Sequence, residues 1–396
     1  MIVVITAGIY PLTGGRELAS YGLCNELNKI TQVKIFSLLD EKYDIKIAQK
    51  EHMQFDVEFA HNFEKQKNKL FEITKYGKER IEAKLAYLKP VYNNLIKKII
   101  KYIENNSVDT IIIDHVMMGL YYKILKYKFP NIKYIYNSHN AEFINTFAEH
   151  YDNISSKYFK KKIQYKRCLL RKKMEKELIS GTDTTLCISK NDIEVLKKEF
   201  GCSNKYVYSK PLIYFEQIKT RDKLNKFNKK LLIVGSMNWY PNVKGILWFV
   251  ENVFVEILKY DEEFKLYIVG RNPHDDIKKL EKQYKNVIVT GEVPDTDKYF
   301  EMCDISIIPV FEGTGAKIKV LESIARGIPT VCSAFAAKDY DVTEKEILIA
   351  HNAKEFIDDI IMIGKDNKLR QNLFEAMRSY YDNYFELSKD VTNHVL

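Results

Sequence analysis

Short runs of apolar residues alternate with longer amphipathic stretches along the whole chain. Runs such as IVVIT and TIIID are rich in Ile and Val. Nearly continuous apolar runs of this kind are typical of parallel strands that helices cover on both faces. The pattern predicts strands at 2–6, 32–37, 109–114, 132–137 and 184–188, with helices near 16–29, 64–104, 117–128, 155–180 and 190–200.

The alternation stops and then begins again at residue 229. Segment 214–229 is polar and charged with little apolar periodicity, which predicts an interdomain linker. The second half predicts strands in LLIVGS, FKLYIVG, NVIVTG, DISIIPV and IPTVCS, with helices at 243–258, 274–284, 296–302 and 316–326. We therefore expect an α/β protein of two doubly wound, Rossmann-like domains, 1–213 and 230–380, facing each other across a cleft. The last segment, 381–396, is expected to be a helix that returns to the first domain.

Length and composition fit this organisation. A chain of 396 residues suits two domains, and 46% hydrophobic residues exclude a disordered chain. No basic segment precedes the apolar start, and no apolar run approaches the ~20 residues of a membrane span. Six cysteines lie singly along the chain, which suggests neither a zinc site nor a disulfide framework. The expectation is a soluble protein of the reducing cytoplasm.

The net charge of +9 is unevenly distributed. Residues 1–213 hold 36 Lys and Arg against 24 Asp and Glu, whereas the remainder holds 26 against 29. A surplus confined to one half suits an anionic membrane surface or a phosphate-bearing substrate. Nucleic acid is not expected, because the basic residues lack interleaved aromatic stacking motifs.

Two glycine-bearing loops follow predicted strands, where ligands of open α/β sheets bind. Gly14 and Gly15 precede the first helix, whose N-terminus attracts anions, although a flexible turn is an equally good interpretation. The second loop contains Gly313, Thr314 and Gly315.

Lys317 and Lys319 follow the second loop at the start of a predicted helix. A diphosphate needs N–H donors and cations, and this loop offers both. Lysines at a helix N-terminus oppose the helix dipole, which favours a bound anion over a solvated helix start. Glu322 follows on the same helix and could accept both hydroxyls of a ribose.

These segments carry a resemblance to a known family. LLIVGSMNWYPNVKGILWFV, LYIVGRNP, VTGEVPD and PVFEGTGAKIKVLESIARGIPTV resemble the donor-binding domain of retaining GT-B glycosyltransferases of family four, the glycosyl transferases group 1 family. The resemblance implies a GT-B fold, with the glycine loop and following lysines on the nucleotide diphosphate and Glu322 on the ribose. It also implies that the loops of Arg271 and Val293 lie at the nucleobase.

The chain departs from the family pattern in two places. Many members have two glutamates separated by seven residues, the first contacting the donor sugar, whereas nine residues separate Glu312 from Glu322. Many members also carry an arginine after the first strand of this domain, where this chain has Ser236 and Met237. Lys244 is expected to take the place of the lysine that follows in the family.

The first domain shares the resemblance. His139 follows the strand at 132–137 and resembles the active-site histidine of the family, and Gly14–Gly15 resembles its diphosphate-contacting loop. The alternative for His139 is a structural histidine that only forms hydrogen bonds.

The basic stretch 155–178 holds ten Lys and Arg between residues 157 and 176. A solvated surface helix is one interpretation, and attachment to anionic lipid or to a lipid-diphosphate acceptor is the other. Its predicted packing face comprises Phe159, Ile163, Leu170, Met174 and Leu178.

The sequence therefore predicts a retaining glycosyltransferase that moves a sugar from a nucleoside-diphosphate donor to a sugar, lipid-linked or protein-linked glycan acceptor. No cofactor and no metal site are expected, because no Asp-x-Asp-like cluster follows a strand. The resemblance implies a role in bacterial surface glycan or glycoprotein assembly, in the cytoplasm or at the inner membrane face. The alternatives are a catalytically silent subunit that partners another glycosyltransferase, which the missing arginine favours, and a sugar-nucleotide epimerase.

Overall fold

The protein is described from a computed structural model. The structure describes residues 1–12, 15–52, 54–61, 91–144, 158–201, 205–212, 221, 223–224, 226–384 and 395, with side chains of the long helix from residue 165 onward. Gly14 lies outside the described residues, as do residues 64–90 of an expected helix, most of the expected linker and most of segment 381–396. The chain forms two compact units, Met1–Tyr214 with Ser388–Leu396 and Phe215–Leu387, which we call the first and second unit.

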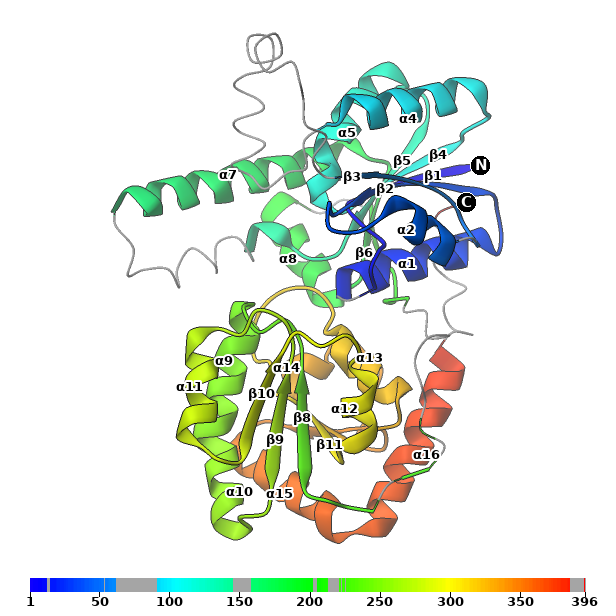
Figure 1. The fold of residues 1–396 in the computed structure, drawn as a ribbon. Helices are drawn as coiled ribbons and strands as arrows, with labels where there is room; N and C mark the ends of the chain where they lie inside the picture. The colour runs from blue at the N-terminus through cyan, green and yellow to red at the C-terminus, as the bar shows by residue number, and fades with distance from the viewer. Residues whose placement is uncertain are drawn as a thin grey trace. The chain divides into compact units, whose positions relative to one another are not determined.

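Within the described residues, the first unit contains a parallel sheet in the order β3-β2-β1-β4-β5-β6-β7 (Figure 1). Its strands are β1 (Ile2–Thr6), β2 (Val33–Leu39), β3 (Asp56–His61), β4 (Thr110–Asp114), β5 (Lys133–Ser138), β6 (Thr184–Cys187) and β7 (Tyr206–Tyr208). Its helices are α1 (Gly15–Asn28), α2 (Ile45–Glu51), α4 (Asn93–Asn105), η1 (Val116–Met118), α5 (Gly119–Lys128), α7 (Tyr158–Gly181) and α8 (Lys190–Phe200).

Helices cover both faces of this sheet. Alternate residues of a strand point to opposite faces, so Val3 and Ile5 pack with α4, α5 and α7, whereas Ile2 and Val4 pack with α1 and α2. Figure 1 shows α4 and α5 on one side of the strands and α1 and α2 on the other. Val395 is buried in the core on the α1 side, where its carbonyl accepts from Lys133 Nζ at 3.1 Å. The chain therefore returns to the first unit near its end.

The second unit contains a parallel sheet whose described strands run in the order β10-β9-β8-β11-β12-β13. The strands are β8 (Lys230–Val234), β9 (Lys265–Val269), β10 (Val287–Gly291), β11 (Ile305–Ile308), β12 (Thr330–Ser333) and β13 (Leu348–Ala350). The helices are α9 (Tyr240–Phe249), η2 (Val250–Phe254), α10 (Val255–Tyr260), α11 (Asp275–Gln283), α12 (Asp297–Met302), α13 (Ile318–Ala325), α14 (Ala334–Ala337), α15 (Ala353–Lys365) and α16 (Asn367–Tyr384). Because α16 runs to Tyr384, the second unit continues beyond residue 380, where the pattern predicted its end.

Three strands were not predicted from the sequence, namely β3, β7 and β13. Each lies at an edge of its sheet. β7 and β13 have only three residues, and β3 (DVEFAH) carries charges between its apolar positions. Edge strands are covered less completely than central ones, so they do not need the continuous apolar run by which the other strands were found.

Each sheet has one point where the chain changes direction across it. β1 and β4 are neighbours in the first sheet, and β8 and β11 are neighbours in the second. Ligands of open α/β sheets bind outside the carboxyl ends of the strands at such a switch point. The loops expected to bind a ligand are therefore those after β1, β4 and β5 in the first unit and those after β8 and β11 in the second.

Candidate functional site

The loops after β8 and β11 are brought together by a close approach of α9. A Cβ atom on Gly245 would lie 1.7 Å from the carbonyl oxygen of Pro309, so only glycine allows the helix to pack against the chain leaving β11. Trp239, which ends the β8 loop, would likewise meet a Cβ on Gly313 at 3.3 Å. The β8 loop therefore lies next to residues 313–315, which we call the glycine loop.

The glycine loop has a shape that side chains disfavour. Gly313 and Gly315 have φ of 108° and 73°, which glycine adopts without steric cost. The Nζ of Lys317 donates to the carbonyls of Thr314 at 2.9 Å and Gly315 at 2.6 Å. Lys317 is 4% exposed and its ammonium lies 5.1 Å from the Phe335 ring centre. Lys317 thus holds the loop in this shape from within.

Lys319 takes a different position. α13 begins at Ile318 rather than near Ala316, so Lys319 lies in its first turn. Its Nζ donates to Asn242 Oδ1 at 2.7 Å, and Asn242 donates to the Ser236 carbonyl at 2.8 Å. A Cβ on Gly235 would lie 3.0 Å from the same Nζ. Burial, reinforced by the charge of Lys317 and opposed by that of Glu322, lowers the pKa of Lys319 to about 8. The lysine therefore joins α13 to the loop after β8.

Glu322 lies one turn further along α13 and remains 20% exposed at its side chain. Arg326 Nη1 is 3.8 Å from Glu322 Oε1, while Nε and Nη2 of Arg326 donate to Asp297 Oδ1 at 2.9 and 2.8 Å. Arg326 thus ties α13 to α12 and orients Glu322 without covering it.

Lys244 and Glu312, both expected near the donor, form an ion pair with each other. Lys244 Nζ lies 3.0 Å from both carboxylate oxygens of Glu312. The two side chains are 54% and 40% exposed. An ion pair this exposed contributes little to stability.

The positions expected at the nucleobase lie on loops after β9 and β10. The carbonyl of Arg271 accepts from the Met237 amide at 3.0 Å, which ties the β9 loop to the β8 loop. Val293 packs against the core around Leu232 and Phe300. Ser236 and Met237 stand where many members of the resembled family have arginine, so this position offers no cation, and Met237 is completely buried.

In the first unit, a buried carboxylate organises the loops at the switch point. Asp114 ends β4 and is 1% exposed. Its Oδ2 accepts from the hydroxyls of Thr6 and Ser20 at 2.6 Å each, and its Oδ1 accepts from Asn137 Nδ2 and His139 Nε2 at 2.7 Å each. Burial alone would raise the pKa of Asp114, but the His139 imidazole and the hydrogen bonds outweigh it and hold that pKa below its usual range. His139 itself is 3% exposed.

A second carboxylate–histidine pair lies beside the first. His115 has an unusual φ of 78° for a residue other than glycine. Its Nδ1 accepts from the Met117 amide at 3.2 Å and its Nε2 lies 3.1 Å from Glu142 Oε1. Burial lowers the pKa of His115. The His115 and His139 rings are 5.5 Å apart.

Helix α7 supports this second pair. Arg171 Nη1 lies 3.4 Å from Glu142 Oε2, and the Glu175 carboxylate accepts from the amides of Glu142 and Phe143 at 3.0 Å each. Burial and the neighbouring charge of Glu142 raise the pKa of Glu175 to about 8. The basic helix is therefore anchored beside the loop that carries His139.

Of the two glycines expected to contact the diphosphate in the first unit, only Gly15 is among the described residues. It is the first residue of α1.

Sequence reasoning missed several residues of these two sites. Asp114 closes the apolar run TIIID, and a carboxylate at the end of a buried strand was the available signal. Asn242 and Glu142 lie in ordinary helical stretches with no such signal. Their roles depend on contacts with Lys319 and His115, which are distant in sequence.

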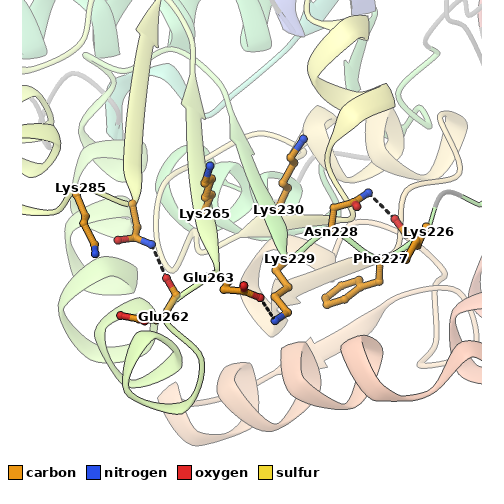
Figure 2. A pocket seen from close by; sticks show the side chains of 10 residues that line it. Lys226, Phe227, Asn228, Lys229, Lys230, Glu262, Glu263, Lys265 and Lys285 are labelled. Atoms are coloured by element: carbon orange, nitrogen blue, oxygen red, sulfur yellow. Dashed lines mark hydrogen bonds and ion pairs between the residues drawn. The ribbon is translucent and has the colours of Figure 1, made fainter.

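A separate hollow of about 670 Å³ lies at the amino ends of the strands of the second sheet, opposite the carboxyl ends that carry the candidate site (Figure 2). It is lined by residues next to the amino ends of β8, β9 and β10, including Lys229, Lys230 and Lys265. Lys229 Nζ pairs with Asp261 at 2.6 Å and Glu263 at 2.5 Å. Because ligands of such sheets bind at the carboxyl ends of the strands, we do not take this hollow as the candidate site.

Within the part of the chain that the structure describes, no group of three or more His, Cys, Asp or Glu side chains is placed to hold a metal ion. None of the described helices combines the length and apolar character needed to cross a bilayer.

Part of the second unit matches a known protein family. Residues 228–366 match the family described as Glycosyl transferases group 1. This stretch begins just before β8 and ends just after α15, so it contains the glycine loop, Lys319 and Glu322. Most of the second unit therefore matches the model of the Glycosyl transferases group 1 family.

The whole chain resembles solved glycosyltransferase structures. Sucrose-phosphate synthase of Thermosynechococcus elongatus superposes with a TM-score of 0.70 at 16% identity, covering 99% of this chain and 98% of that one. HepE of Anabaena, solved with UDP and glucose, gives 0.68 at 11% identity over 99% and 98%. WaaG, a glycosyltransferase of lipopolysaccharide biosynthesis, gives 0.64 at 13% identity over 100% and 99%. These likenesses show that the fold is GT-B.

One curated relative matches over part of its length. An uncharacterised 44.6 kDa protein of the cps region of Klebsiella pneumoniae is 23% identical over 241 residues. The match spans 59% of this chain and 60% of the relative.

Proposed function

We propose that the protein is a glycosyltransferase that moves a sugar from a nucleoside-diphosphate donor to an acceptor hydroxyl, with retention of anomeric configuration. The observation that carries the proposal is the glycine loop with Lys319 and Glu322 at the switch point of a glycosyl transferases group 1 domain. The likeness to HepE, solved with UDP and glucose, supports a donor of this class.

Lys319 and the glycine loop are the proposed ligands of the diphosphate. Backbone N–H groups at the start of α13 and the ammonium of Lys319 supply donors and positive charge. Lys317 already donates to two loop carbonyls, so its proposed role is to shape the loop and add charge at short range. Lys244 is a further cation at the rim of the site, paired with Glu312.

The remaining parts of the donor fall to neighbouring loops. Glu322 is proposed to accept from the ribose hydroxyls, and the loops of Arg271 and Val293 to line the nucleobase. Glu312 is proposed to face the donor sugar together with Lys244. In the first unit, His139 and the Gly14–Gly15 loop are proposed to face the sugar and diphosphate.

The chemistry requires charge neutralisation at the leaving group. The departing diphosphate gains negative charge as the sugar gains oxocarbenium character, so fixed cations and N–H donors lower the barrier. Lys319 and Lys317 are proposed to supply this charge without a metal ion. We expect EDTA to leave the transfer rate within about twofold of its untreated value, and loss of activity that Mg²⁺ or Mn²⁺ restores would contradict this.

Direct identification of the donor tests the proposed function. The purified protein is incubated with a panel of UDP-, GDP- and ADP-sugars, and mass spectrometry detects which remain bound and which release nucleoside diphosphate. We expect one nucleotide sugar to be bound and slowly hydrolysed, because water can replace the acceptor. Binding of none, at millimolar concentration, would contradict the proposal.

A silent subunit is the second candidate, and the missing arginine favours it. Ser236 and the buried Met237 stand where many members of the resembled family carry that cation. A silent subunit would bind a nucleotide sugar without turning it over under any acceptor condition. An epimerase would instead convert the bound sugar nucleotide with no acceptor present, which the same mass spectra distinguish.

The setting is also a proposal. We place the protein in the cytoplasm at the inner face of the cell membrane, acting on a sugar, lipid-linked or protein-linked glycan. The cps-region relative and the likeness to WaaG support surface glycan assembly. The cationic face of α7 supports contact with anionic lipid.

A further inference from the structure

The buried contacts of Asp114 fix where the proton of His139 lies. Each oxygen of the carboxylate accepts two hydrogen bonds, and an ionised carboxylate cannot donate one. The 2.7 Å contact between Asp114 Oδ1 and His139 Nε2 therefore requires a proton on Nε2. Asn137 Nδ2 lies 3.2 Å from the same Nε2, but it donates to the same Oδ1, so the two donors converge on one oxygen.

The other ring nitrogen has no partner among the described residues. His139 Nδ1 is buried and forms no hydrogen bond with any of them. In the neutral imidazole with its proton on Nε2, Nδ1 carries a lone pair and can only accept. A buried acceptor without a donor destabilises the folded state, so an arrangement that keeps one calls for a reason.

The neighbouring His115 shows that this part of the fold can satisfy a histidine completely. His115 uses both nitrogens, Nδ1 toward the Met117 amide and Nε2 toward Glu142. The two rings lie 5.5 Å apart in the same buried layer. The difference between them is that His139 keeps one acceptor unused at the carboxyl end of β5, on the side of the sheet where ligands bind.

We propose that Asp114 is a positioning residue that holds His139 in the Nε2–H tautomer, so that Nδ1 accepts a hydrogen bond from a hydroxyl of the sugar substrate. The choice of a sugar hydroxyl rests on the proposed function, whereas the tautomer does not. Since water competes little in so buried a place, one such hydrogen bond orients the substrate strongly. Asp114 also ties β1, α1 and β5 together through Thr6, Ser20 and Asn137.

The tautomer can be measured on the unmodified protein. The full chain is labelled with ¹⁵N-histidine, and the His139 signals are assigned among its eight histidines by their loss in His139→Gln. Long-range ¹H–¹⁵N correlation spectra at neutral pH should show a protonated Nε2 and a bare Nδ1. In Asp114→Asn the Nε2–H population should fall, because the amide no longer offers an ionised acceptor. A proton on Nδ1 in the unmodified protein would overturn the proposal.

Turnover supplies the second measurement, with UDP-glucose and the other nucleotide sugars of the panel as probes. Asp114→Asn should slow turnover roughly 10- to 100-fold, as His139→Gln does, with donor affinity nearly kept. The double variant should be no slower than His139→Gln alone, because both changes remove one interaction. Additive losses would show that Asp114 acts only through stability.

Glu142→Gln is the matched control, since it makes the same chemical change at the neighbouring carboxylate–histidine pair. We expect it to leave the His139 tautomer unchanged, and a tautomer shift of the same size in this variant would overturn the assignment to Asp114. If no nucleotide sugar is turned over by the unmodified protein, the proposed function fails. The tautomer spectra still decide the role of Asp114, also where Asp114→Asn does not fold.

Discussion

At the scale of single residues, two lysines that look equivalent in sequence have different surroundings. Lys317 donates its hydrogen bonds to carbonyls of its own loop, whereas Lys319 donates to Asn242 beside the β8 loop. Spacing along a helix could not distinguish them, because the difference lies in the direction of each side chain. Lys319 is partly exposed, and its pKa is lowered to about 8.

We expect donor affinity to fall as pH rises through about 8, because Lys319 loses its proton there and no longer offers a charge to the diphosphate. Below that pH the lysine is charged and binding is strongest, and the bound diphosphate in turn raises the pKa of Lys319. A nucleotide sugar is the suitable ligand, since its esterified diphosphate does not titrate near pH 8. Calorimetry from pH 7 to 9 measures the effect.

Two variants control this measurement. Lys319→Gln should weaken binding by roughly 10- to 100-fold at pH 7 and remove most of the pH dependence. Lys265→Gln, an exposed lysine at the opposite edge of the same sheet, should change neither. A Lys319→Gln protein with the pH profile of the unmodified one would exclude this lysine as the source.

Glu322→Gln should reduce affinity for the ribonucleotide donor by roughly 10-fold or more, because a charged acceptor of two hydroxyls is replaced by a neutral one. The matching 2′-deoxyribose donor should lose less from this variant than the ribose donor does. Equal losses for both donors, measured by calorimetry, would contradict a contact with the ribose. Arg326 holds Glu322 in place, so the melting temperature is recorded for both proteins.

At the scale of elements, the second-unit site depends on how closely α9 packs against the chain after β11. The sequence predicted a helix from 243, but α9 begins at Tyr240 with Pro241 in its first turn and continues through the π-turn η2 into α10. Proline suits this position because the N–H that it lacks would have no partner in the first turn of a helix. This earlier start brings Trp239 and Asn242 to the glycine loop and Lys319.

Gly245→Ala should destabilise the second unit by about 1–3 kcal/mol, because the added methyl group meets backbone and no side chain can move aside. Urea unfolding measures the loss, and donor affinity should fall with it as the loop after β11 shifts. Gly364→Ala in α15 is the matched control, since its Cβ meets the edge of the Phe227 ring at 3.0 Å. We expect that variant to stay within about 0.5 kcal/mol of the unmodified protein.

At the scale of the whole molecule, the positive charge is concentrated in the first half of the chain, and α7 carries part of it. In the structure, not all of the basic residues of this helix are exposed. Arg171 is buried against Glu142 and Lys172 pairs with Glu199, whereas Lys166, Lys173 and Lys176 are exposed. Tyr165 and Leu169, 52% and 45% exposed, lie on the same turns. Lysines interleaved with exposed apolar side chains suit the headgroup layer of a bilayer.

We expect the protein to bind vesicles that contain anionic lipid and to release them as salt rises toward about 0.15 M, where the Debye length is ~8 Å. Replacing Lys166, Lys173 and Lys176 by Gln should weaken binding on the order of 100-fold, at roughly 1 kcal/mol per lysine. Sedimentation with vesicles of graded phosphatidylglycerol content measures it. The same exchange at Lys259, Lys279 and Lys282 of the second unit is the control, and an equal loss there would reduce the effect to net charge.

The sequence by itself determined the parts of the molecule whose signal is local. Continuous apolar runs identified the central strands, because a strand covered on both faces must be apolar throughout. The glycine loop with Lys317, Lys319 and Glu322 was recognisable because glycines with positive φ and a following helix are specified by neighbouring residues. The resemblance to the Glycosyl transferases group 1 family rested on the same segments, which lie within the matched residues 228–366.

Only the tertiary structure decided which side chains meet. Asp114 ends β4 whereas His139 follows β5, Asn242 and Lys319 lie 77 positions apart, and Glu142 is held by a helix more than 25 residues away. Edge strands such as β3 escaped the pattern because one side of them is less covered. The division of roles between Lys317 and Lys319, and the atom of His139 left to meet a substrate, depend on distances of a few ångströms between segments. Such distances are set by packing, which the local pattern of residues does not encode.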